Sequence, residues 1–207
     1  MPSDPAQSPA VQRFIKSMSL DMDQWRDGDG YDLSALQGLS NPEAACVLDL
    51  LNDRLESSGA GWREVDALAA LDIPPARMAL GRLSTHPSAE VRLRAAGVLD
   101  ARKPAGATER EVIRLLDDPD TDIGAAALMD RAEEHPTPGV RAALLRCALD
   151  GAPRLRVHAA ALALFFGGGA DEPFDWNHRP LFLEFGEESR AVRVAAMAKL
   201  EALMRPA

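Results

Sequence analysis

The sequence is poor in cysteine and in aromatic residues, and it has no long apolar run. Its two cysteines, Cys46 and Cys147, stand far apart, so we expect buried free thiols and no disulfide framework. Aromatic residues make up 5%, while alanine and leucine carry much of the 46% hydrophobic content, which favours packed helices over a β-sandwich. No segment approaches the roughly 18 apolar residues of a membrane span. We therefore expect a cytoplasmic protein that does not associate with membranes.

Clusters of basic residues are missing too. The net charge is −9, and its distribution along the chain is uneven. Residues 1–75 hold 13 acids and 5 bases, giving −8, whereas residues 76–207 hold 19 acids and 18 bases, giving −1. Nucleic-acid binding needs clustered lysine and arginine, so we expect no nucleic-acid partner. The acidic N-terminal third is suited to attract a basic protein instead.

Motifs for catalysis or metal binding are not found. The sequence has no His-Glu-x-x-His, no Cys-x-x-Cys and no nucleophile elbow, and its four histidines are widely spaced. Residues 165–169, Phe-Phe-Gly-Gly-Gly, lack the Lys-Ser/Thr of a phosphate loop and indicate the end of a helix. We predict a non-enzymatic protein with no catalytic residue, no metal site and no cofactor.

A repeated pattern predicts the fold. Four segments each carry an aliphatic residue followed by alanine four positions later, which places both on one face of a helix. The aliphatic positions recur at spacings of 32, 32 and 37 residues. We expect the small alanines to be buried where neighbouring helices approach closely. The pairs are Val91 and Ala95, Ile123 and Ala127, Leu155 and Ala159, and Val192 and Ala196.

These repeats resemble the HEAT-repeat family, including the phycobilisome-lyase-like repeats. Residues 87–96 carry the resemblance most clearly and residues 118–123 more weakly, although Gly124 stands where the family usually has arginine. The resemblance implies an all-α fold, an α-solenoid of antiparallel helix pairs (an ARM-type superhelix). It also implies that the recurrent Arg92, Arg156 and Arg193 join a ladder of ion pairs and carbonyl contacts. The alternative is a line of arginines facing an anionic ligand, as in HEAT-like DNA glycosylases.

The predicted organisation has three parts. Residues 1–10 are expected to form a flexible tail, residues 11–40 an N-terminal cap with an acidic loop, and residues 41–207 the helical repeats. An insert at residues 167–177 interrupts the last repeat.

Two loops supply all of the candidate partner-binding residues except Trp62, which starts a predicted helix. The loop at residues 21–32 combines five carboxylates with two aromatic residues but lacks the spacing of an EF-hand, so a solvated cap, a partner contact and a metal site are the alternatives. The aromatic residues of the later insert either dock a partner or fold back over the last helix pair. The predicted contact residues are Asp21, Asp23, Trp25, Asp27, Asp29, Tyr31, Trp62 and Trp176.

Residues 18–33 and 62–68 also resemble small bacterial HEAT-like proteins encoded beside polymorphic toxins. That resemblance implies an immunity protein that binds and neutralises a toxin, for which an acidic surface facing a basic toxin domain makes electrostatic sense. The alternatives are a general assembly scaffold and a lyase-like or DNA-repair-like HEAT enzyme.

Overall fold

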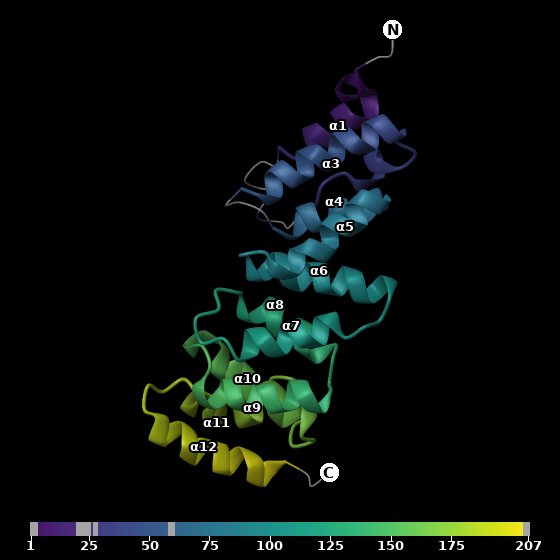
Figure 1. Cartoon of the computed structure of the whole chain (residues 1–207). Coiled ribbons are helices and arrows are strands. Elements are labelled where there is room, and N and C mark those ends of the chain that lie inside the picture. The colour runs from purple at the N-terminus through teal and green to yellow at the C-terminus, as the bar shows by residue number, and fades with distance from the viewer. Residues whose placement is uncertain (1–3, 20–25, 27–28, 58–60, 205–207) are drawn as a thin grey trace. The chain divides into compact units, whose positions relative to one another are not determined.

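The computed structural model describes residues 4–19, 26, 29–57 and 61–204, and all regular structure in these residues is helical. The chain divides into two compact units, an N-terminal unit (Met1–Pro104) and a C-terminal unit (Ala105–Ala207). Figure 1 shows the helices of each unit following one another in chain order. The all-α class expected from the sequence is confirmed.

The N-terminal unit is a series of helices that pack on their chain neighbours. α3 packs on α4, and α4 in turn packs on α5 and α6. Its core includes the fully buried Phe14, Leu51, Leu68 and Leu80. The elements are η1 (Pro5–Gln7), α1 (Pro9–Ser17), η2 (Leu33–Leu36), α3 (Asn41–Leu55), α4 (Trp62–Leu71), α5 (Pro74–Arg82), η3 (Leu83–Thr85) and α6 (Ala89–Arg102).

Residues 5–10, which fall in the predicted tail, include helical elements in the structure. Ser8 caps α1 by accepting from the Val11 backbone N–H at 3.3 Å, and Pro9 occupies the first helical position. A hydroxyl N-cap followed by proline is a strong helix start, so residues 5–10 belong to η1 and α1. The sequence predicted a flexible tail at residues 1–10, and the structure places residues 5–7 in η1 and residues 9–10 in α1.

The C-terminal unit is built in the same way. α9 packs on α7 and α10, while α12 packs on α9, α10 and α11. Leu115, Leu144, Leu155, Phe182 and Phe185 are fully buried in this unit. The elements are α7 (Ala107–Leu116), α8 (Ala125–Glu133), α9 (Pro138–Asp150), α10 (Pro153–Phe166), η4 (Trp176–His178), α11 (Arg179–Glu184) and α12 (Arg190–Leu203).

Three of the four predicted core alanines are confirmed and one is wrong. Ala95, Ala159 and Ala196 are fully buried, but Ala127 is exposed. The Asp118 carboxylate accepts from the Asp120 backbone N–H at 3.0 Å, which makes a turn where the helix was expected to begin. Because α8 then begins later, its buried aliphatic and alanine pair is Leu128 and Ala132.

Candidate functional site

The structure describes residues 26 and 29–32 of the predicted acidic loop. Asp21, Asp23, Trp25 and Asp27 lie outside the described residues, so their predicted partner contact stays a prediction. Asp29 is exposed, and its backbone carbonyl accepts from the Arg63 Nε at 2.7 Å. The loop thus returns to the start of α4.

Tyr31 is an interior residue. Its ring packs edge-on against Phe14, and its hydroxyl donates to the carboxylate of the buried Glu64. Glu64 also accepts from the Gly61 backbone N–H at 2.9 Å, so a single carboxylate holds both Tyr31 and the first turn of α4. Burial, together with the bond to Glu64, raises the pKa of Tyr31 to about 12. In the free protein Tyr31 therefore has a structural role.

Trp62, the first residue of α4, contacts the residue that precedes Tyr31. Its indole packs against Gly30, where an added Cβ would come within 3.5 Å of the ring. The Arg63 guanidinium stacks over the indole at 4.7 Å, and the side chain of Trp62 is half-buried. Trp62 and Tyr31 together fix residues 29–32 onto α4.

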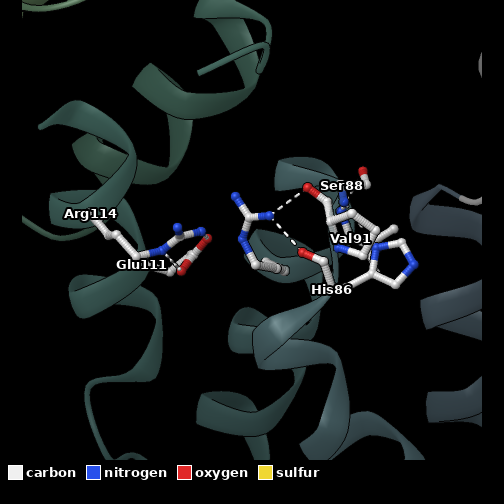
Figure 2. Close-up of polar contacts among 7 residues, drawn as sticks. His86, Ser88, Val91, Glu111 and Arg114 are labelled. Carbon is white, nitrogen blue, oxygen red and sulfur yellow. Dashed lines mark hydrogen bonds and ion pairs between the residues drawn. The ribbon is translucent and has the colours of Figure 1, made fainter. Parts of the chain in front are cut away.

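His86 connects two helices of the N-terminal unit. One ring nitrogen, Nε2, lies 2.9 Å from the Leu55 carbonyl at the end of α3, and Nδ1 accepts from the Ser88 backbone N–H at 3.1 Å. Because Nδ1 faces a donor, the hydrogen sits on Nε2. Figure 2 shows His86 beside Ser88. Arg92 donates to the carbonyls of His86 and Pro87 at 2.6 and 2.7 Å. These contacts give His86 a structural role at the end of α3 and the start of α6.

The recurrent arginines hold the turns that precede their helices. Arg92, Arg156 and Arg193 each stand four residues after an N-cap and donate to the carbonyl just before that cap, at 2.7 to 2.8 Å. Arg77 and Arg110 occupy the same position in α5 and α7 and make the equivalent bond. This confirms the expected carbonyl contacts and gives these arginines a role in the fold.

Ion pairs add links between and within helices. Arg94 pairs with Asp66, and within the C-terminal unit Arg146 pairs with Asp117, each through two bonds. Figure 2 also shows the pair within α7 between Glu111 and Arg114, at 2.6 and 2.8 Å. In these ion pairs the arginine side chains bond to carboxylates of the same chain.

Exposed large apolar side chains gather at the last helix pair. In the part of the chain that the structure describes they are Met78 of α5 and five residues between positions 176 and 203. Those five are Trp176, Leu183, Val192, Val194 and Leu203, with exposed fractions of 37% to 68%. Isolated exposed apolar residues are ordinary, but a concentration on one part of a surface marks an interaction site.

The two aromatic residues of the insert before α11 differ in their surroundings. Phe174 folds back, with its ring 5.4 Å from that of Phe182 and 5.7 Å from that of His158. Trp176 instead remains 68% exposed, with the Arg179 guanidinium 5.2 Å from its ring. Of the predicted contact residues that are described, Trp176 is the large apolar side chain most open to solvent.

Sequence reasoning missed Leu183, Val192, Val194 and Leu203. A signal was present in α12, because its apolar residues fall on two sides of the helix rather than one. Ala196 and Leu200 face the core, whereas Ala191, Val194, Ala195, Ala198 and Ala202 are exposed.

The charge contrast seen along the sequence does not separate the two units. Residues 76–104 carry six bases and two acids, which offset much of the negative charge before them. The N-terminal unit therefore has 15 acids and 11 bases, or −4, and the C-terminal unit has 17 acids and 12 bases, or −5. Both units therefore carry a net negative charge.

Within the described residues no group of three or more histidine, cysteine or acidic side chains is placed to hold a metal ion. The same residues include no helix long and apolar enough to cross a membrane. Comparison with protein-family models, curated proteins and solved structures finds no match for this chain.

Proposed function

We propose that this chain is a non-enzymatic protein-binding protein whose helix pairs form a HEAT-like α-solenoid. Within each unit, successive helices pack on their neighbours, and arginines hold the turns between them. This mode of construction leaves long helix faces available for contact with another protein.

The observation that carries the proposal is the apolar surface of the last helix pair. Trp176 and Leu183 are 68% and 47% exposed, although burying a large apolar side chain is worth about 1.5 to 3 kcal/mol. Tryptophan is also the residue type most enriched among binding hot spots. A partner that covers this surface gains that free energy.

The specific function that we propose is that of an immunity protein, which binds a bacterial toxin in the cytoplasm and neutralises it. The proposal rests on the resemblance of residues 18–33 and 62–68 and on the net charge of −9, which favours a basic toxin domain. A general assembly scaffold shares the same binding surface and is the second candidate.

Co-expression with the product of the neighbouring gene tests this function. If that product is a toxin, we expect the wild-type chain to restore growth of the host and to co-purify with the toxin. Val194→Glu is expected to reduce both effects. Met78→Glu likewise introduces a glutamate at an exposed large apolar residue, in the other unit, and serves as the control.

Protection without a stable complex would contradict neutralisation by binding. A stable complex with a non-toxic product would instead support the scaffold.

A further inference from the structure

α11 and α12 pack on each other, and we call their exposed apolar residues together the terminal apolar face. Along α12, Val194, Ala198 and the neighbouring alanines follow i, i+3 and i+4 spacing and are all exposed. The face consists of Leu183, Ala191, Val192, Val194, Ala195, Ala198, Ala202 and Leu203.

The face continues from α12 onto α11. Lys199 of α12 pairs with Glu184 of α11 at 2.7 Å, so this edge of α12 lies against α11. Val192 and Leu203 are seven residues before and four residues after Lys199, which places them on that same edge. Two large apolar side chains of α12 therefore lie along its junction with α11, and the exposed Leu183 directly precedes Glu184 in α11.

Trp176 extends the surface on the α11 side. It begins η4, which runs directly into α11, and Pro180 and Leu183 follow it at i+4 and i+7. All three are exposed, as expected for residues on one side of a continuous helical segment.

The charges around this face are mostly uncompensated acids. Residues 171–204 hold seven acids and four bases, or −3. Two of these bases, Arg190 and Lys199, are paired with Asp150 and Glu184, and Arg193 is buried against backbone carbonyls. By contrast, the exposed Glu187, Glu188 and Glu201 have no ion pair among the described residues.

We propose that the terminal apolar face binds an amphipathic helix of a partner protein, one whose apolar side is flanked by lysine and arginine. The four exposed alanines of α12 allow a helix backbone to approach closely. The unpaired glutamates then meet the flanking bases of the partner. A second copy of this chain is a poorer occupant, because it brings the same acids to the contact. The inference rests on the proposed function and specifies the partner's chemistry.

A synthetic peptide provides the test. The probe is a labelled peptide of about 18 residues, long enough to form a helix, with leucines at helical spacing and lysines elsewhere. One comparison peptide has the same composition in shuffled order, and a second has every lysine replaced by glutamate. Each is titrated with the full chain in about 0.15 M salt while the fluorescence anisotropy is followed.

We expect the periodic lysine peptide to bind and both comparison peptides to bind at least about tenfold more weakly. Val194→Glu and Trp176→Ala should each weaken the binding of the periodic peptide by about tenfold, and Met78→Glu should leave it unchanged. Glu188→Lys should weaken binding of the periodic peptide and reduce the dependence of that binding on salt. Glu133→Lys makes the same charge change at an exposed residue of α8 and should leave binding unchanged. Circular dichroism verifies that each variant remains folded.

Equal binding of the shuffled peptide would show attraction by charge alone and would overturn the inference. Equal binding of the glutamate peptide, or wild-type affinity in both Val194→Glu and Trp176→Ala, would overturn it too. A wild-type dimer that Val194→Glu dissociates would make a second copy the occupant and would also overturn it. If the peptide does not bind but a toxin complex survives Val194→Glu, this inference fails and the proposed function stands. If the peptide binds as expected but the chain forms no complex with a toxin, the inference stands and the proposed immunity function fails.

Discussion

At the scale of single residues, buried polar side chains stabilise local structure. Glu64 accepts from both the Tyr31 hydroxyl and the Gly61 backbone N–H, and it is itself buried. Burying a carboxylate destabilises the folded state unless its oxygens accept hydrogen bonds. The Tyr31 hydroxyl and the Gly61 backbone N–H supply those bonds to Glu64. The interior position of Tyr31 follows from that requirement.

The ionisation of Tyr31 tests this contact directly. It is the chain's single tyrosine, so the ultraviolet absorbance of tyrosinate reports on this residue alone. We expect a midpoint near pH 12 in the folded protein and the ordinary value near 10 after unfolding. Because the pKa is raised on folding, the stabilisation is complete below pH 10 and is lost as the pH rises from 10 towards 12. A folded-state midpoint near 10 would show that the hydroxyl is exposed.

Arg193 is the most heavily bonded of the recurrent arginines. It is buried and donates to the carbonyls of Leu149, Glu187 and Glu188. Replacing Arg193 with methionine keeps much of the packing volume but leaves these acceptors without their donor. We expect the free energy of unfolding, measured in urea, to fall by about 2 to 4 kcal/mol.

Arg141 is the control for that substitution. It stands at the same position of α9, but no carbonyl bond to its side chain is found in the described residues. Arg141→Met should cost less than about 1 kcal/mol. Equal losses for the two variants would mean that the carbonyl bonds add no stability.

At the scale of elements, α8 shows how a local turn changes a repeat. The Asp118 turn delays the helix, so Leu128 and Ala132 face the core instead of Ile123 and Ala127. Ile123 is still buried, but as a loop residue that precedes the helix.

Enlarging the two alanines distinguishes these arrangements. Ala132→Leu should destabilise the protein by about 1 to 3 kcal/mol, because the added atoms overpack a fully buried position. Ala127→Leu should change stability by less than about 0.5 kcal/mol, since that residue is exposed. Thermal unfolding of both variants measures the difference. A larger loss of stability for Ala127→Leu than for Ala132→Leu would mean that Ala127 is the buried alanine, as the sequence predicted.

The glycines after α10 fit against the end of α12. A Cβ at Gly169 would lie 2.4 Å from Leu164 Cδ1 and 2.8 Å from the Leu203 backbone oxygen. Gly169→Ala should therefore cost about 1 to 3 kcal/mol in urea unfolding. Gly97, inside α6, has open space around it, so Gly97→Ala should stabilise by about 0.5 to 1 kcal/mol. Stabilisation by Gly169→Ala would contradict the close packing.

At the scale of the whole molecule, charge decides which macromolecules bind. The net charge is −9, and many arginines already bind carboxylates or backbone carbonyls. We expect no binding to duplex DNA or single-stranded RNA in a mobility-shift titration at about 0.15 M salt. Micromolar binding that weakens steeply as salt is added would reveal a basic surface and would favour the DNA-repair alternative.

The sequence alone determined the helical class and the positions of most helices. These follow from residues close together in the chain, such as Ser88 before α6 and Pro138 at the start of α9. Backbone hydrogen bonds in helices are local, so N-caps, prolines and apolar spacing are enough to predict them. The recurrent Arg92, Arg156 and Arg193 were also visible as a pattern, because they bond to turns only five residues away.

Only the tertiary structure decided which faces are covered. Tyr31 is buried because a distant carboxylate, Glu64, meets its hydroxyl, whereas Val194 is exposed because no described helix covers that side of α12. Both residues belong to segments whose local sequence is compatible with burial or exposure. The outcome depends on packing between residues far apart in the chain, and burial free energy depends on the area that those neighbours remove from water. The terminal apolar face is therefore a property of the assembled helices.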